Sequence, residues 1–507
     1  MLRLVPRYRS RVGILKKKSL WISACAALTA VATLAGCGGT TYTNGRSLPP
    51  SGITNRVMIA IQNPSSLSTG ALEIVDAYYD ERTTYNGSSS YISIAGYGSS
   101  TPVSIQNMPE EQLGAVYSSS NGSLALVNYA GETVSSTISN SNGVAASEFI
   151  TRSEKYVFAA NLKAQTLTAM NESAGTTASL SLPSVYRVSV NTGGSVALAF
   201  VENSNYVYYP RQLTTAETLG YTGGSSKWPK AAVDCEPRST PTWCLFQMQS
   251  PDNKYVDNAG ETQYYGAPLT FDHPIKAVFS SDGSTAYILS CGPECGGSTA
   301  SYTAVQISPM IFLSNQSSGL LPTTTALANA TVKIPGGASN ALIDGTTMYV
   351  VGQAPQTVNN ETLYGGNLTV VDLSKSKISN AAVSISDGTP GATSRMIEAD
   401  DDTLWIAMQD CTTGVRYATS ATGGYGCLTM YNTSTNTVTM LESYIGSATG
   451  IAAVSGLHKI YAAVGGQVYI YSTKDGSSLD NQYVTVTGTA YDVAYMDATT
   501  DSDNTVY

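Results

Sequence analysis

Two cysteines near the middle of the 507-residue chain lie close enough to do chemistry together. The segment Cys291-Gly-Pro-Glu-Cys295 places two thiols four residues apart. Such a pair can cycle between a dithiol and a disulfide, bind a metal ion with further ligands, or form a structural cross-link. Which of these applies depends on the compartment in which the protein folds and on the secondary structure around Cys291.

The N-terminus predicts export from the cytoplasm. Residues 1–18 carry seven basic side chains, and no acidic residue precedes Glu73. An uncharged run from Ser19 to Gly36 follows and ends before Cys37. A basic segment, an apolar segment and small residues at its end form a secretory signal. The alternative is an uncleaved membrane helix, because about 18 apolar residues are nearly enough to span a bilayer.

The tetrad Leu34-Ala35-Gly36-Cys37 resembles the lipobox of bacterial lipoproteins. The resemblance implies that residues 1–36 are removed and that Cys37 is lipidated, which would hold the protein to a membrane. Members of that class that stay in the inner membrane carry Asp after the cysteine, whereas this chain has Gly38. We therefore expect a lipid-anchored envelope protein, in the outer membrane where the cell has one, facing the periplasm or the surface. Residues 37–52, rich in Gly, Ser, Thr and Pro, are expected to be a flexible tether.

Composition limits the class of protein. Loss of seven of the 27 basic residues with the signal leaves 20 against 36 acidic ones, a net charge of −16. An acidic chain without basic clusters is a poor nucleic-acid binder. Charged residues make up only 12%, and 33 Tyr stand against 7 Phe. Because Tyr suits half-exposed β-surface, we expect an exported all-β protein.

A repeated pattern covers residues 53–507. An alternating apolar strand, a turn and a second apolar strand recur at 187–203, 276–292, 340–353, 395–411 and 452–466. Candidate third strands occur eight times, at 72–77, 124–129, 166–171, 207–212, 304–308, 368–373, 428–432 and 468–472. Four-stranded units at such intervals predict a single β-propeller, with eight blades by strand count and seven as the alternative. An array of two β-sandwich domains is the competing architecture.

The segments FSSDGSTAYIL (279–289) and LTVVDLSKSK (368–377) resemble those of YVTN-type propellers, relatives of the cytochrome d1 and WD40-like families. The resemblance implies the fold and no catalytic residue. Residues 55–62 lack a preceding strand, and the end of the chain looks like a blade that stops early. We therefore expect the ring to close by pairing of the N- and C-terminal strands. An insertion at about 219–272 interrupts one blade.

Six cysteines remain for an oxidising compartment once Cys25 is lost with the signal and Cys37 is lipidated. They fall into neighbouring pairs, which we expect to be disulfides: Cys235 with Cys244, Cys291 with Cys295, and Cys411 with Cys427.

The Cys291 pair differs from the Cys-Gly-Pro-Cys motif of thioredoxin-like enzymes by one additional residue. Those enzymes place the first cysteine at a helix N-terminus, whereas here we expect it to end a strand with no helix after it. A metal site would need further Cys or His nearby, and the chain has only His273 and His458. A structural cross-link is therefore favoured over redox chemistry or metal binding.

Two acidic clusters and three tyrosines are weaker candidates. Carboxylates at alternate positions can bind Ca²⁺, but both clusters occupy positions expected for hairpin turns. Alternating burial along a strand is expected to explain the tyrosines, although they could line a sugar- or peptide-binding surface. Both histidines are expected in turns or at blade junctions. The residues are Glu398, Asp400, Asp401, Asp402, Asp497, Asp501, Asp503, Tyr206, Tyr208 and Tyr209.

The sequence predicts binding rather than catalysis. No nucleophile elbow, P-loop or His-Glu-x-x-His helix occurs, so no catalytic, cofactor-binding or metal-binding residue is predicted. We expect a non-enzymatic binding or scaffold protein whose partner is an envelope protein or polysaccharide. Its recognition loops would be 219–272, 292–302, 353–366 and 411–427. The alternative is a periplasmic propeller enzyme, a glycan lyase or hydrolase or a quinoprotein-like oxidoreductase, with its catalytic groups at one end of the central channel.

Overall fold

A computed structural model describes most of the chain after the predicted signal. The described residues are 45–63, 69–81, 92–97, 101–118, 121–139, 147–152, 156–171, 176–191, 195–213, 232–236, 242–249, 253–256, 262–265, 267–307, 331–390, 395–419, 426–441 and 446–499. Cys37 and the predicted signal, residues 1–36, therefore lie outside them. The chain divides into two compact units between Thr54 and Asn55. In the first, residues 45–54 form turns, and the Gly52 amide donates to the Pro49 carbonyl at 2.9 Å.

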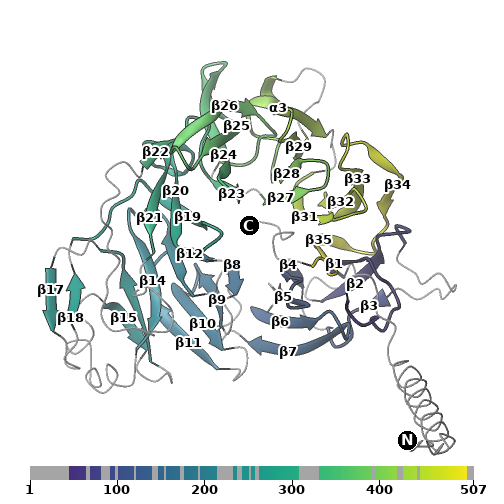
Figure 1. Ribbon diagram of the computed structural model, residues 1–507, viewed down its shortest axis with the longest axis horizontal. Helices are drawn as coiled ribbons and strands as arrows, with labels where there is room; N and C mark the ends of the chain where they lie inside the picture. The colour runs from purple at the N-terminus through teal and green to yellow at the C-terminus, as the bar shows by residue number, and fades with distance from the viewer. Residues whose placement is uncertain are drawn as a thin grey trace, which may run out of the picture. The chain divides into compact units, whose positions relative to one another are not determined.

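The second unit is a ring of eight antiparallel sheets (Figure 1). The first strand of each sheet lies nearest the centre and contacts the first strand of the next sheet, all the way round. The eight-bladed propeller that the strand count predicted is thereby confirmed, and the sandwich array is wrong. Each of the eight predicted third strands is the third strand of a blade.

The strands of the first four blades are as follows. Blade 1 comprises β4 (Pro102–Met108), β5 (Leu113–Ser118), β6 (Ser123–Asn128) and β7 (Thr133–Ser139). Blade 2 comprises β8 (Ser147–Arg152), β9 (Tyr156–Asn161), β10 (Thr166–Asn171) and β11 (Thr177–Ser181). Blade 3 comprises β12 (Val185–Val190), β13 (Ala197–Val201), β14 (Val207–Gln212), β16 (Trp243–Gln247) and β15 (Ala232–Glu236). Blade 4 comprises β19 (Pro274–Phe279), β20 (Thr285–Cys291), β21 (Ala300–Gln306) and β22 (Thr331–Lys333).

The remaining blades follow the same order. Blade 5 comprises β23 (Asn340–Asp344), β24 (Thr347–Val358), β25 (Glu361–Asp372) and β26 (Lys377–Ser384). Blade 6 comprises β27 (Arg395–Ala399), β28 (Thr403–Ala407), β29 (Leu428–Asn432) and β30 (Thr437–Leu441). Blade 7 comprises β31 (Ala448–Val454), β32 (Lys459–Val464), β33 (Gln467–Ser472) and β34 (Ser478–Val484). Blade 8 comprises β35 (Thr489–Tyr495), β1 (Arg56–Gln62), β2 (Gly70–Asp76) and β3 (Ile92–Ser93).

Blade 8 closes the ring, as expected, by joining the two ends of the second unit. Its innermost strand, β35, pairs antiparallel with β1 from Val57 opposite Tyr495 to Gln62 opposite Thr489. Both strands are almost wholly buried because blades 7 and 1 cover their two faces. The two ends of the unit thus close the ring within one sheet.

The insertion in blade 3 supplies strands of its own. The chain leaves β14, forms the outermost strand β15, and returns as β16 between them. A separate hairpin of β17 (Asn253–Val256) and β18 (Thr262–Tyr265) follows before blade 4 begins. The segment predicted as an interruption therefore completes the blade that it interrupts.

The apolar cores lie between blades. Alternating side chains of each blade pack against the neighbouring sheet, as Trp405 and Tyr471 of blades 6 and 7 do at 6.1 Å between ring centroids. Only two helical segments are described within the ring, η2 (Gly292–Cys295) and α3 (Val415–Thr419). Across the described part of the chain, no helix has the length and apolar character needed to cross a bilayer.

Candidate functional site

The Cys291 pair lies in a short helical turn between the second and third strands of blade 4. Cys291 ends β20 as predicted, but η2 begins directly after it, so the expectation that no helix follows was wrong. Pro293 suits the start of a helical turn, and Gly296 ends it in the left-handed region at φ 89°. The structure joins Cys291 to Cys295, with their Cα atoms 5.9 Å apart.

The other two cysteine pairs also join within single blades. Cys235 and Cys244 face each other across β15 and β16, with Cα atoms 4.0 Å apart. Cys411 and Cys427 are 5.6 Å apart and close the connection between β28 and β29. These are the three pairings that the sequence predicts. Each cross-link holds the base or edge of a connection rather than two distant parts of the ring.

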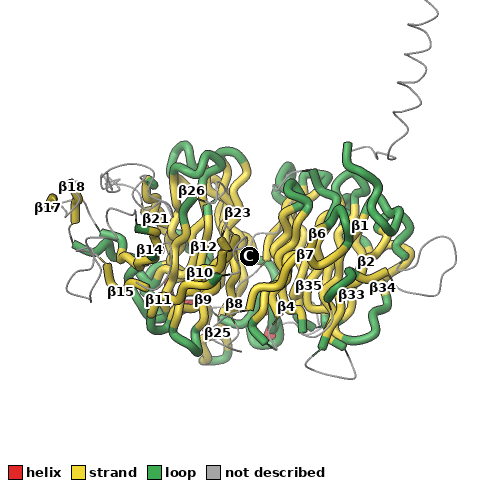
Figure 2. The backbone as a smooth tube through the Cα atoms, turned by 90° about the horizontal axis from the view of Figure 1, so that it is seen from below, coloured by secondary structure: helices red, strands yellow, loops and turns green. Residues whose placement is uncertain are grey.

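Three successive blades carry elaborate connections on one face of the ring. Because strands alternate in direction, every connection between second and third strands lies on that face. In blade 5 this connection is not the predicted loop 353–366, because β24 and β25 continue as a hairpin with Asn359 and Asn360 at positive φ in its tight turn. Figure 2 shows the helical segments, in red, at the same edge of the ring as the label of β25.

These connections bond to one another. The Gln353 amide of the hairpin donates to the buried Glu294 carboxylate of η2 at 2.9 Å. The Tyr364 hydroxyl donates to the Pro293 carbonyl at 2.9 Å. We call residues 292–296, 353–366 and 411–419 together the braced surface.

A buried carboxylate connects the hairpin to the α3 segment. Asp387, which follows β26, accepts from the Gly366 amide at 2.7 Å and from the Arg416 amide. Burial raises the pKa of Asp387, although both amides oppose that rise. The exposed end of the braced surface carries Tyr417, whose side chain is 46% exposed. Buried carboxylates therefore fix the backbone of the braced surface, while Tyr417 is exposed on it.

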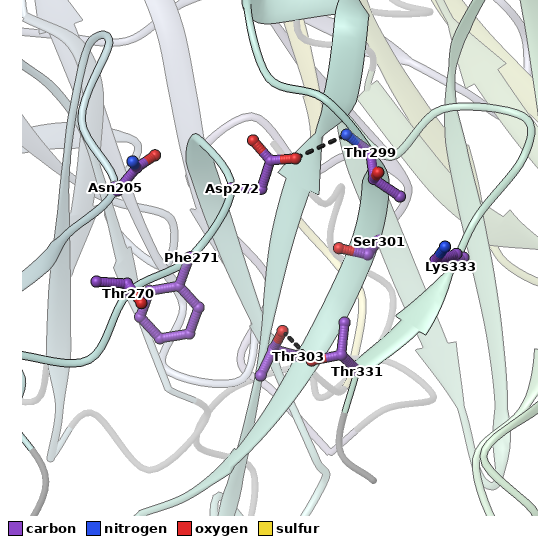
Figure 3. Close-up of a pocket in the computed structure, with 9 residues that line it drawn as sticks. All are labelled: Asn205, Thr270, Phe271, Asp272, Thr299, Ser301, Thr303, Thr331 and Lys333. Atoms are coloured by element: carbon purple, nitrogen blue, oxygen red, sulfur yellow. Dashed lines mark hydrogen bonds between the residues drawn. The ribbon is translucent and has the colours of Figure 1, made fainter.

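A polar cleft of about 430 Å³ lies between blades 3 and 4 (Figure 3). One side is formed by Asn205 of the turn before β14 and by residues 270–272 before β19, and the other by β21 and β22. Asp272 accepts from the Ser298 amide at 2.9 Å and the Thr299 amide at 2.7 Å, which fixes the turn after η2. Sequence reasoning missed this cleft, although a threonine repeated at one place in the third strands was a visible signal.

The central channel carries charged side chains from the innermost strands. Arg395 of β27 forms an ion pair with the buried Asp492 of β35 and reaches past blade 7 to do so. Asp492 also accepts from the Ile105 amide of β4 at 2.7 Å. These charges therefore link blades 6, 8 and 1.

A buried lysine performs a similar role elsewhere in the channel. Lys276 of β19 donates to Asn340 of β23 at 2.6 Å. Burial, with the charge of Arg187 second, lowers the pKa of Lys276 well below its usual value. Arg187, Lys276, Asn340 and Arg395 each begin a repeat in the sequence, so the repeat places a polar residue at an equivalent position on four innermost strands.

Glu398 lies near the end of β27 opposite Arg395 and tests how burial changes the pKa of an ionisable group. Burial, and then the negative charge of Asp344, raises the pKa of Glu398 to about 7. The folded state thus holds a proton that the unfolded chain releases near pH 4.5, and wild-type stability should fall as pH rises from about 4.5 to 7.

Glu398→Gln should remove that loss. In urea unfolding, the variant should gain stability over wild type as pH rises, reaching about 1 kcal/mol above pH 7 after allowance for partial solvent exposure. Glu361→Gln, at the exposed hairpin tip, is the control. A difference between Glu398→Gln and wild type that stays constant with pH would contradict the assignment.

Asp400, Asp401 and Asp402 of the first acidic cluster lie in a hairpin turn, as predicted, whereas Glu398 of the same cluster lies in β27, where the turn prediction was wrong. The turn bonds to blade 7. Asp401 lies 2.8 Å from the Nδ1 atom of His458, and Asp400 accepts from the Gly456 amide at 2.8 Å. His458 thereby lies in a turn, as expected. Among the described residues, no group of three or more His, Cys, Asp or Glu is arranged to hold a metal ion.

For Asp497 of the second acidic cluster, the prediction of a solvated turn was wrong. Asp497 is not a solvated turn residue, because it is 4% exposed and forms an ion pair with Arg56. Its neighbours Asp501 and Asp503 lie outside the described residues.

The remaining candidates take their expected places. Tyr209 is buried and stacks on Phe246 at 5.4 Å, while Tyr206 and Tyr208 are half-buried. His273 lies where blade 3 passes to blade 4. Alternating burial therefore accounts for the tyrosines.

Comparisons with known proteins extend to the fold only. The sequence matches no family model and no curated relative. Dihydro-heme d1 dehydrogenase NirN is similar over 88% of this chain and 75% of its own, with a TM-score of 0.45 and 11% identity. Hydrazine synthase of Kuenenia stuttgartiensis is similar over 73% and 95%, with a TM-score of 0.43 and 11% identity. A 6-phosphogluconolactonase-like protein of Bacteroides uniformis is similar over 87% and 99%, with a TM-score of 0.39 and 10% identity.

Proposed function

We propose that this protein is a lipid-anchored propeller of the cell envelope that binds another envelope component, a protein or a polysaccharide, without chemical turnover. The observation that supports this most is the braced surface, in which three successive connections are bonded into one unit. Three disulfides accord with an exported protein. The anchor would be Cys37.

A braced surface suits recognition for an energetic reason. Binding costs free energy whenever side chains or loops must be ordered, about 0.5–1.5 kcal/mol for each immobilised side chain. Here Glu294 and Asp387 already hold the backbone of the hairpin in place. Tyr417 adds an exposed aromatic side chain, a type that often dominates binding energy.

If the protein were a propeller enzyme, its catalytic groups would lie at one end of the central channel. Arg395, Asp492 and Lys276 bond there to neighbouring strands, and thereby hold blades together. A substrate would have to displace those bonds to reach the charged groups. We therefore assign activity to the surface rather than to the channel.

The anchor is tested by removing the thiol that would carry lipid. Cys37→Ala should abolish labelling by an alkyne fatty acid and shift the protein from the membrane pellet to the soluble envelope fraction. A wild-type protein that takes up no fatty acid, together with a variant that stays in the pellet, would contradict the anchor.

Binding through the braced surface is tested by removing its exposed aromatic side chain. Tyr417→Ser should weaken co-sedimentation of the anchor-free Cys37→Ala chain with purified envelope fragments by about tenfold, equivalent to 1.4 kcal/mol. Tyr78→Ser is the matched control, because Tyr78 is 60% exposed on a turn of the opposite face. Equal losses in both variants would argue against this surface.

A further inference from the structure

Four blades carry a threonine at the same place in the third strand. The pairing of second and third strands sets Thr303 opposite Ile288 in blade 4, and Thr369 opposite Val350 in blade 5. Thr429 of blade 6 and Thr168 of blade 2, which is fully buried, have the same register. The four threonine side chains are therefore structurally equivalent.

In blades 5 and 6 this place is filled by the segment that enters from the previous blade. A Cβ atom on Gly336 would lie 2.9 Å from the Thr369 hydroxyl, so the backbone packs directly on it. The Ser386 hydroxyl lies 2.8 Å from that of Thr429, and the Ser386 backbone amide donates to the same Thr429 oxygen at 3.1 Å. Both threonines are fully buried.

Among the described residues, the same place in blade 4 opens to the cleft between blades 3 and 4, where Thr303 is half-buried. Residues 270–272 of the entering segment line the opposite side of that cleft. Ser301 and Thr303 alternate along β21 and share one side of the sheet, and Thr299 directly precedes the strand. Thr331 of β22 lies beside them, its hydroxyl 2.9 Å from that of Thr303 (Figure 3).

The lining of the cleft indicates the ligand. Eight of its nine side chains are polar, and Phe271 is the single apolar one. Hydroxyl and amide groups both donate and accept hydrogen bonds, as the hydroxyls of a sugar do. The volume of about 430 Å³ falls in the range of small-molecule sites.

We propose that this cleft binds a saccharide unit of an envelope polysaccharide. The proposal goes beyond the proposed function and adds a second binding site, because no residue that lines the cleft belongs to the braced surface. The saccharide hydroxyls would replace the contacts that Gly336 and Ser386 supply in blades 5 and 6. Lys333, exposed at the edge of the cleft, would face an acidic substituent where the saccharide carries one.

The test is calorimetric titration of the detergent-purified full chain with two probes. One is the disaccharide released from peptidoglycan, and the other is the oligosaccharide released from outer-surface polysaccharide by mild acid. We expect saturable binding of one probe, weakened about tenfold by Thr303→Val and abolished by Thr331→Trp, which fills the cleft from an exposed position. Thr437→Val is the matched control, because it breaks a similar hydroxyl pair, Thr435 with Thr437 at 2.8 Å, outside the cleft.

Each outcome decides the proposal. Lys333→Gln should weaken binding only of an acidic saccharide, and the probe that binds identifies the source. Binding of neither probe, or undiminished binding by a folded Thr331→Trp protein, would overturn the saccharide assignment. Envelope binding that persists in Thr331→Trp but is lost in Tyr417→Ser would then leave the proposed function intact, whereas loss of envelope binding by the wild-type chain would refute the function itself.

Discussion

Asp497→Asn should lower the free energy of unfolding by about 3–5 kcal/mol, because it leaves a buried guanidinium without its main counter-charge. Arg56 is 1% exposed, and its side chain donates to Asp497 at 2.6 and 3.0 Å. The same guanidinium donates to Glu132 of blade 1 at 3.0 Å. Asp497 thus ties the end of the propeller to its first strand at the point where the ring closes.

A surface ion pair provides the control, and urea unfolding measures the loss of stability in both variants. Lys375 and Asp372 lie 2.6 Å apart on an exposed turn, and Asp372→Asn should cost much less stability than Asp497→Asn. Similar losses in Asp497→Asn and Asp372→Asn would show that the ring does not depend on the buried pair.

Arg395→Met should cost about 3–5 kcal/mol at pH 8, because Asp492 then remains as a buried carboxylate without its cation. Burial already raises the pKa of Asp492, and the Arg395 charge opposes that rise. Without Arg395 the pKa should rise further, so the folded state should take up a proton as the pH falls. The stability deficit relative to wild type should therefore shrink between pH 8 and pH 5.

A second substitution tests the cause of that pH dependence. Adding Asp492→Asn removes the group that titrates, so the stability difference between the double variant and Asp492→Asn alone should not change between pH 8 and pH 5. A deficit of the single variant that grows on acidification would contradict the account.

Local sequence pattern predicted the blades because each blade is a local structure. A strand such as 428–432 follows its partner within the same repeat, and alternation of apolar side chains reports which face is buried. The extended hairpin at 353–366 escaped prediction because its polar, exposed strands lack that alternation of buried positions.

Contacts between blades could not be predicted from local sequence pattern. Arg56 and Asp497 are separated by 441 residues, and nothing adjacent to either one indicates its partner. The cleft depends on where residues 270–272 lie relative to β21 and β22. The residue type at position 303 does not determine that placement. The repeated threonine marks the position, but only the three-dimensional comparison of Thr303 with Thr369 shows that one is open and the other filled.

Photo-crosslinking in intact cells tests the central claim, binding through the braced surface, most directly. A benzophenone amino acid would replace Tyr417 on α3 or, in the matched control, Tyr78 on the opposite face. We predict an ultraviolet-dependent adduct with an envelope protein or polysaccharide at position 417 and none at position 78. An adduct at position 78 with none at position 417 would contradict the claim.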